Sequence, residues 1–215
     1  MCNLYTVRKS ADEVAAHFGV ANPAYSNAGA EVYPGTPGMV VREEDGHRIM
    51  QSMAWGFPVR LKGMSPTAKP KPVNNIADLR KSFWIGLARK PQWRCIIPLT
   101  AFAEAEGPKG GKTRTWFNVK DQPIFAWAGL WRMSDEWGPV YSGAMTDCNE
   151  AIRPIHDRMP VLLQPEEYDQ WLRGSFDVAV GFQDRCYPDE LIEMVRTRDP
   201  WNKPKASQPT ATTLL

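Results

Sequence analysis

The first periodic segment of the chain predicts a short amphipathic helix between Ser10 and Gly19. Ser10 is followed three residues later by Glu13, the spacing of a capping box, in which each side chain satisfies a backbone amide of the other residue. Val14 and Phe18 lie on one helical face, and Gly19 is of the residue type that commonly ends a helix. We therefore expect this helix to pack on a core through one face.

The middle of the chain alternates apolar and polar residues in the manner of half-buried strands. The turn Glu43-Glu44-Asp45-Gly46 separates two such runs, and its Asp-Gly pair predicts a hairpin. A Gly/Lys-rich tip at residues 109–112 marks a second hairpin. The predicted strands are residues 39–42, 47 toward 55–58, 93–98, 115–119, 124–131, 140–145 and 161–163.

Helical patterns recur later in the chain. The predicted helices are residues 83–87, the segment from Pro165 through Leu172 that Gly174 ends, and a last short helix that begins near Pro188 and turns Leu191, Ile192 and Val195 inward. Residues 202–215 are rich in Pro, Thr, Ser and Lys, a composition typical of a disordered tail. The pattern predicts one α+β domain of antiparallel strands over residues 1–201.

The composition is that of an ordinary globular domain rich in aromatic residues. Of 215 residues, 43% are hydrophobic and 23% charged, with nine Trp and 19 Pro. The net charge of +2 is too small to establish a nucleic-acid partner, although it is compatible with a local basic groove. The Lys-, Pro- and Gly-rich residues 62–71 predict an exposed basic loop.

The cysteines and histidines favour neither a disulfide framework nor a metal site. The four cysteines form no C-x-x-C pair, and His17, His47 and His156 lack metal-ligand spacing, so we expect no metal or cofactor. The chain opens without a basic, apolar leader, so we expect a reducing cytoplasm. No stretch approaches membrane-spanning length, so no membrane partner is expected.

Cys2 can perform chemistry that an internal cysteine cannot. A small residue after the initiator Met normally permits removal of that Met, which would give Cys2 a free α-amine beside its thiol. The amine condenses with an aldehyde to an imine, and the thiol closes on the imine carbon as a thiazolidine. An α-amine titrates near pH ~8 and a thiol near ~8.5, so both nucleophiles are accessible at neutral pH. The alternative is that Cys2 is an inert residue at a frayed terminus.

Three other polar residues stand in settings that suit catalysis. Glu104 lies among Ala and Phe, where a carboxylate is costly to bury unless it is paired or used; the alternative is a surface position on an Ala-rich helix. His156 lies between Pro154 and Pro160, which suits a fixed proton donor or acceptor; the alternative is that His156 has only a structural role. Asn75 is either a site residue or an ordinary turn residue.

The order of the short motifs along the chain resembles the SOS response-associated peptidase (SRAP), or abasic-site processing, family up to about Trp171. The N-terminal Cys together with H-x-R-M-P is the most specific part. The motifs are Met1-Cys2-Asn3-Leu4-Tyr5, Trp55-Gly56-Phe57-Pro58, Asn75, Cys95-Ile96-Ile97-Pro98 followed by Glu104, Phe125-Ala126-Trp127-Ala128-Gly129-Leu130-Trp131, Thr146-Asp147-Cys148-Asn149 and His156-Asp157-Arg158-Met159-Pro160.

This resemblance implies a single α+β domain around a curved, barrel-like, mostly antiparallel sheet with flanking helices, and a basic groove for single-stranded DNA. It implies that Cys2 captures the aldehyde of an abasic site as a covalent thiazolidine. Asn75 would hold the N-terminus and the sugar, while Glu104 and His156 would move protons during imine formation, ring closure and reversal. We expect a monomer whose partner is single-stranded DNA containing abasic sites.

The resemblance also implies residues that bind DNA. Arg158 would grip a phosphate through its guanidinium fork. Trp55 would stack on an unpaired base or act as a wedge, with a core Trp as the alternative.

The chain departs from the family pattern at three points. Many members have Cys-Gly-Arg where this chain has Cys2-Asn3-Leu4, an Arg at the position of Ala77, and a Trp at that of Ala105. These changes keep the reactive groups but remove expected DNA contacts. The candidates to replace them are Arg80, Lys81 and the basic loop 62–71, and Asn74 is an alternative to Asn75.

Two other functions remain open from the sequence. Cys2 could attack an amide with His156 as base, which would make the protein a cysteine peptidase, with self-removal of the leading residue as its simplest activity. The aromatic and basic residues could also form a non-catalytic module that binds single-stranded DNA.

Overall fold

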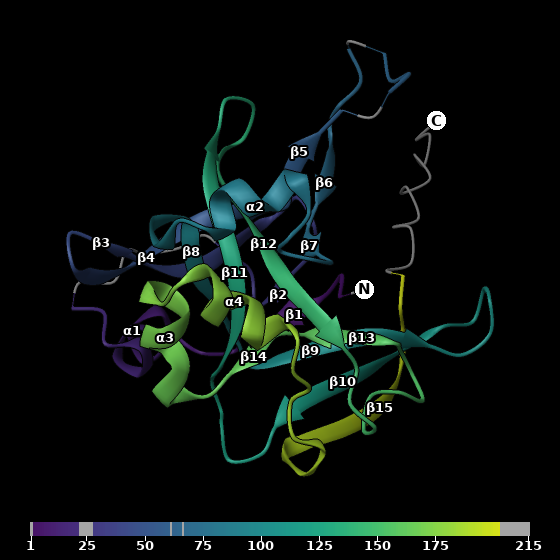
Figure 1. Cartoon of the computed structure of the whole chain (residues 1–215). Coiled ribbons are helices and arrows are strands. Elements are labelled where there is room, and N and C mark those ends of the chain that lie inside the picture. The colour runs from purple at the N-terminus through teal and green to yellow at the C-terminus, as the bar shows by residue number, and fades with distance from the viewer. Residues whose placement is uncertain (1, 22–27, 61, 66, 203–215) are drawn as a thin grey trace, which may run out of the picture.

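The computed structural model describes residues 2–21, 28–60, 62–65 and 67–202. Among these residues, two large sheets form the body of the molecule, and the helices cover part of its surface (Figure 1). The helices are α1 (Ala11–Phe18), α2 (Ser82–Ala88), α3 (Tyr168–Arg173) and α4 (Phe176–Gln183), with single 3-10 turns η1 (Pro91–Trp93), η2 (Pro165–Glu167) and η3 (Asp189–Leu191). Of the predicted tail, all but Asn202 lies outside the described residues.

The smaller of the two large sheets carries the N-terminal strand. Its five strands pair antiparallel in the order β15 (Ile192–Pro200), β10 (Thr113–Val119), β9 (Ala101–Glu106), β1 (Tyr5–Thr6) and β2 (Glu31–Val32). The pairing of β1 with β9 places Tyr5 opposite Phe102. The start of the chain is therefore held between two other segments rather than left at an edge.

The larger sheet closes on itself. Its path runs β13 (Arg158–Pro160), β12 (Gly138–Asp147), β4 (His47–Trp55), β3 (Pro37–Glu44), β8 (Arg94–Leu99), β11 (Phe125–Ser134) and β14 (Leu162–Leu163), with β7 (Asn75–Ile76) also paired to β12. Because β12 pairs with both β4 and β11, the strands β12, β4, β3, β8 and β11 form a ring. A separate hairpin pairs β5 (Phe57–Val59) with β6 (Lys71–Val73).

The predicted α+β single domain is confirmed, and most elements lie where the patterns placed them. The pairings of β12 with β4 and β7 are parallel, so the larger sheet is mixed. The Ser10 side chain accepts from the Glu13 amide, and Gly19 caps α1 with φ +68°. The predicted hairpin turns in the left-handed region, with φ +49° at Asp45 and +79° at Gly46.

Two assignments near the C-terminus were wrong. The segment after Pro188 forms one 3-10 turn and then strand β15, and Val195 is 48% exposed rather than inward. The backbone N–H and C=O groups at the edge of β10 form hydrogen bonds with β15 along the pairing. This long-range pairing outweighs the helical spacing of Leu191, Ile192 and Val195. Helix α4, which begins at a side-chain cap from Ser175, was not predicted.

A glycine and a tryptophan determine how the ring holds strand β7. A Cβ on Gly143 would lie 2.0 Å from Cζ2 of Trp127, so only glycine fits under the indole. The Trp127 Nε1 donates to the Ala144 carbonyl at 2.6 Å, which fixes the ring over β12. On the same strand, the Gly143 amide donates to the Asn74 carbonyl at 3.1 Å. The close packing therefore lets β12 present residues 74 and 75.

Arg94 joins the helices to the ring from inside the protein. Its side chain is 1% exposed and donates to the carbonyls of Ala88 and Trp171, near the ends of α2 and α3. It also donates to the carbonyls of Gly174 and Ser175. Burial lowers the pKa of Arg94 to about 10, so the guanidinium stays charged at neutral pH and suits helix C-termini, which carry partial negative charge.

We predict that Arg94→Ala destabilises the fold strongly. Several buried carbonyls lose their donors at once, and each unsatisfied group costs ~1–3 kcal/mol, so the free energy of unfolding should fall by about 3–5 kcal/mol. Urea unfolding followed by circular dichroism measures the change, with the exposed Lys90→Ala as control. Equal stabilities of the two variants would contradict this role.

Candidate active site at the N-terminal cysteine

Cys2 is held at its backbone by two neighbouring amides. Its carbonyl accepts a hydrogen bond from Asn75 Nδ2 at 2.8 Å and one from Asn74 Nδ2 at 3.1 Å. Asn74 Nδ2 also lies 3.1 Å from Asn3 Oδ1. The two residues that the sequence left as alternatives therefore both contact Cys2, and the terminus is clamped to the loop that leads into β7.

Asn75 presents an unused polar atom at this position. The residue is 8% exposed, and its Oδ1 is buried without a hydrogen-bond partner among the described residues. Its amide nitrogen is already occupied by the Cys2 carbonyl. A buried acceptor of this kind is costly unless a ligand or another group satisfies it. Asn75 therefore offers an acceptor beside the N-terminal cysteine.

Trp55 lies in the core, the alternative to the predicted DNA contact, and it supports the clamp from there. Its side chain is fully buried, and its ring packs edge-on against Tyr5 and Trp127 at centroid distances of 5.1 Å and 5.8 Å. Its Nε1 donates to the Asn74 carbonyl at 3.0 Å. The indole is therefore enclosed on its faces and edge, which leaves no surface for a base.

The Cys2 thiol and the Glu104 carboxyl are buried close to each other. The thiol is fully buried, its Sγ lies 3.6 Å from the Leu4 carbonyl, and its pKa is raised by burial and further by the charge of Glu104. Glu104 is 4% exposed on strand β9, so the alternative of a surface position on a helix is wrong. Burial also raises the pKa of Glu104 to about 7.

His156 lies in the turn that precedes β13. Its side chain is 26% exposed, and its Nδ1 accepts from the Arg158 amide at 3.0 Å. Partial burial lowers its pKa, so the imidazole is neutral at neutral pH and carries its proton on Nε2. Nδ1 also lies 3.0 Å from an Asp157 carboxylate oxygen, a contact that favours the protonated ring.

Asp157 and Lys112 both influence Glu104, and neither residue was predicted as part of the site. Among the smaller influences on the pKa of Glu104, the charge of Asp157 raises it and the charge of Lys112 lowers it. Asp157 also opposes the effect of burial on the pKa of His156. Asp157 thus lies within electrostatic reach of both Glu104 and His156. Only the folded chain brings these segments together.

The arginines proposed to bind DNA are largely held by the protein itself. Arg158 donates from Nε to the Thr146 carbonyl at 3.0 Å and from Nη2 to the Ala77 carbonyl at 2.8 Å, while its Nη1 lies 3.7 Å from Asp147. Arg80 pairs with carboxylates of Asp78 and Asp184.

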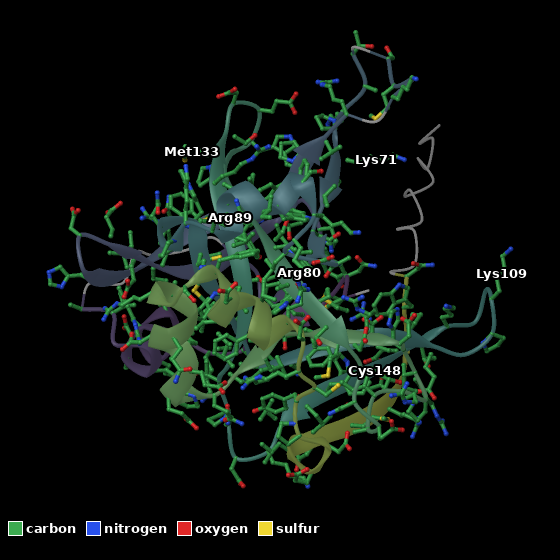
Figure 2. The ribbon with its side chains drawn as sticks, in the orientation of Figure 1. Lys71, Arg80, Arg89, Lys109, Met133 and Cys148 are labelled. Atoms are coloured by element: carbon green, nitrogen blue, oxygen red, sulfur yellow. The ribbon has the colours of Figure 1, made fainter. Side chains whose placement is uncertain are left out.

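Arg80 and Arg158 line a common cavity of about 330 Å³ with these acidic groups. Figure 2 shows Arg80 over the middle of the molecule. Lys81 is exposed at the start of α2.

The described residues contain no cluster of His, Cys, Asp and Glu that could hold a metal ion. All four cysteines are free, and only Cys186 is exposed. None of the described helices combines the length and apolar character needed to cross a membrane.

The fold and site define an α+β domain that encloses a cysteine at its amino end beside a buried carboxyl group. A model of the family described as SOS response associated peptidase (SRAP) matches residues 1–197. The chain belongs to the SRAP family, as the motifs predicted.

Curated relatives and solved structures are similar over most of the chain. The abasic site processing protein YoqW of Bacillus subtilis is 27% identical, with 97% of each chain covered. YobE of the same organism, also named an abasic site processing protein, is 25% identical over 80% of this chain and 82% of its own.

A structure from Bordetella bronchiseptica has a TM-score of 0.76 and 22% identity, covering 91% of this chain and 99% of that one. A structure from Bacteroides thetaiotaomicron has a TM-score of 0.71 and 21% identity, covering 91% of both chains. These structures share the fold.

The raised pKa of Glu104 predicts a pH-dependent stability. The folded state binds the proton up to about pH 7, whereas the unfolded carboxyl releases it near 4.5, so between these values the folded state holds more protons. Stability should therefore fall as pH rises through this window, by at most about 3 kcal/mol.

Glu104→Gln should remove this slope, because the amide does not titrate. Urea unfolding at several pH values from 4.5 to 8 measures it in both proteins. Parallel stability curves for the parent and Glu104→Gln would show that Glu104 is not the group responsible.

Proposed function

We propose that this protein captures the aldehyde of abasic sites in single-stranded DNA as a covalent adduct on Cys2. The observation that carries the proposal is the clamp of Asn74 and Asn75 on the Cys2 carbonyl, because it positions the N-terminal residue rather than leaving it to fray. The names of the YoqW and YobE relatives, as abasic site processing proteins, support the same substrate.

Removal of Met1 would convert the backbone nitrogen of Cys2 into a primary amine. This amine adds to the aldehyde carbon of the ring-opened sugar, and the resulting carbinolamine loses water to give an imine. The thiol sulfur then bonds to the imine carbon, and the thiol proton passes to the nitrogen. The product is a thiazolidine, and one water is released overall.

Glu104 suits the proton transfers of the forward steps. With a pKa of about 7, caused by burial, it is present at neutral pH as both acid and carboxylate. As an acid it protonates the departing hydroxyl, and as a carboxylate it accepts the thiol proton during ring closure. The Cys2 thiol needs such a base, since burial raises its own pKa.

His156 suits the proton transfer to the sugar. Its Nδ1 accepts the Arg158 amide hydrogen, so the neutral ring, which is partly exposed, carries its proton on Nε2. That proton can reach the ring oxygen or the sulfur when the adduct opens. Asn75 Oδ1 would accept from the amine or from a sugar hydroxyl.

DNA contacts are proposed around this centre. Nη1 of Arg158 is the nitrogen of that guanidinium with fewest partners, so it is our candidate for a single phosphate contact rather than a bidentate grip. Arg80 would have to leave Asp184 to bind a phosphate. Lys81 is exposed and would add positive charge beside it.

The terminal chemistry is tested with a single-stranded oligonucleotide that bears an abasic aldehyde. Mass spectrometry should show Met1 absent, and the parent protein should form an adduct stable to heat and denaturant. Cys2→Ser should give at most an imine that borohydride must trap, and Cys2→Ala no thiazolidine.

A stable adduct on protein that retains Met1 would contradict the mechanism. Peptide cleavage without an adduct would instead favour a peptidase, and a mobility shift alone would favour a binding module.

Glu104 and His156 should affect different steps. Glu104→Gln should slow adduct formation, and His156→Ala should form the adduct but release it more slowly, because removing a positioned acid or base costs about 10²–10⁴-fold in rate. A crosslinking time course followed by a chase with unlabelled abasic DNA separates the two steps. Parent-like exchange in His156→Ala, or parent-like crosslinking in Glu104→Gln, would refute the corresponding role.

A further inference from the structure

A cavity with two aromatic walls opens one residue away from the reactive cysteine. It has a volume of about 570 Å³ and is lined by Asn3, Leu4, Tyr33, Pro34, Thr36, Trp201 and Asn202. This volume lies within the range of ~300–1,000 Å³ typical of small-molecule sites. Its apolar lining residues include Tyr33, Pro34 and Trp201, and its polar side chains are the amides of Asn3 and Asn202 and the hydroxyl of Thr36.

The Tyr33 wall is rigid. The Thr36 amide donates to the Tyr33 carbonyl at 3.0 Å across a turn with Pro34 second and Gly35 third, and Gly35 has φ +83°, as a type II turn requires. The Tyr33 hydroxyl donates to Glu31 at 2.5 Å and accepts from Arg114 at 3.3 Å. The ring is therefore held at both ends before any ligand arrives.

The Trp201 wall is anchored to the β9–β10 hairpin. The Trp201 amide donates to the Lys112 carbonyl at 2.8 Å, at the base of the β9–β10 hairpin. Its side chain packs against Leu4, Ala103 and Trp116, which form a small apolar cluster separate from the main core. Trp201 also lies beyond residues 1–197, the part that the SRAP model matches, so this wall is not given by the family pattern.

The cavity is adjacent to the reactive site through Asn3, the residue that follows Cys2. Asn3 lines the cavity. Asn74 Nδ2 donates hydrogen bonds to both Asn3 Oδ1 and the Cys2 carbonyl. Lys112, which anchors Trp201, is exposed and lies within electrostatic reach of Glu104. An occupant of the cavity therefore sits beside Cys2, with a cation nearby to favour a phosphate. Aromatic faces with flanking amides and an adjacent cation match a nucleotide base.

We infer that the cavity between Tyr33 and Trp201 binds the nucleobase next to the abasic nucleotide. This inference rests on the proposed function and adds a specificity site to it. The base would stack on the Trp201 and Tyr33 rings, while Asn3 and Asn202 face its polar edge. Because every base has a flat face, stacking would hold the flanking nucleotide with little sequence preference. It would also fix the position of the abasic sugar at Cys2.

The test uses single-stranded oligonucleotides with a tetrahydrofuran abasic analogue, which cannot crosslink. The fluorescent base 2-aminopurine is placed directly 5′ or 3′ of the analogue, or four nucleotides away. Binding to the parent protein should quench one of the adjacent probes and leave the distant probe unchanged. Trp201→Ala should abolish the quenching and raise Kd about 5- to 150-fold, the range expected for one stacked base.

Two further variants guard against misfolding. Trp201→Phe should restore most of the affinity, and Tyr33→Leu should lose quenching from the opposite wall while keeping apolar bulk. The matched control is Trp137→Ala, a half-buried tryptophan in the β11–β12 hairpin. Parent-like quenching and Kd in both Trp201→Ala and Tyr33→Leu would overturn the inference. Absence of quenching at both adjacent positions in the parent would also overturn it.

Crosslinking of the parent to aldehyde-bearing DNA is measured in parallel. If the parent neither crosslinks nor binds the analogue, the proposed function fails together with the inference. If it crosslinks normally while the fluorescence and Kd predictions fail, only the base-binding site is wrong.

Discussion

The Cys2 carbonyl is the point on which the geometry of this protein depends. Two side-chain amides bind it, and both belong to the segment that β12 holds in parallel pairing. That pairing requires the bare backbone of Gly143, because the Trp127 indole occupies the space where a side chain would lie. The rigidity of the core is thus passed through three contacts to the first residue of the site. An N-terminal residue ordinarily frays, so this connection distinguishes the site from a free terminus.

Burial determines the electrostatics of the site more than charge pairing does. Cys2 and Glu104 are both acids in a region from which water is excluded. Burial raises the pKa of each, and the charge of Glu104 raises the pKa of Cys2 further. Of the two, only Glu104 has a pKa near neutrality, so at physiological pH the carboxyl group gains and loses a proton while the thiol stays protonated. A thiol that remains protonated is also protected from adventitious oxidation, because the thiolate is the reactive form.

The basic residues fall into two groups: arginines that hydrogen-bond within the protein, and exposed lysines. Arg94 and Arg158 donate hydrogen bonds to backbone carbonyls, and Arg80 forms ion pairs with two carboxylates. Lys109, at the tip of the β9–β10 hairpin, points away from the body of the protein (Figure 2). Lys112 directly precedes β10 in the same hairpin. The aromatic residues divide in the same way: Trp55 and Trp127 are enclosed in the core, whereas Trp201 and Tyr33 keep partly open faces.

Local sequence determined the elements whose stabilising contacts are local. The capping box of Ser10 and Glu13, the Asp45-Gly46 turn and the Gly/Lys hairpin tip each involve residues within a few positions of one another, so their outcome did not depend on the rest of the chain. Cys2 and His156 could also be proposed as reactive residues from the sequence, because the Cys near the start of the chain and the His-Asp-Arg-Met-Pro segment are motifs in the chain itself.

Tertiary structure decided what depends on contacts across the chain. The residues after Pro188 became a strand because β10 had an open edge, and Trp55 became a core residue because Tyr5 and Trp127 enclose it. Neither neighbour is visible in the local pattern. The local sequence could not decide whether Asn74 or Asn75 contacts Cys2. Both side-chain amides donate to the Cys2 carbonyl, which is more than seventy residues away in the chain. The pKa of Glu104 follows from burial, and burial is a property of the packed fold rather than of the residues beside it.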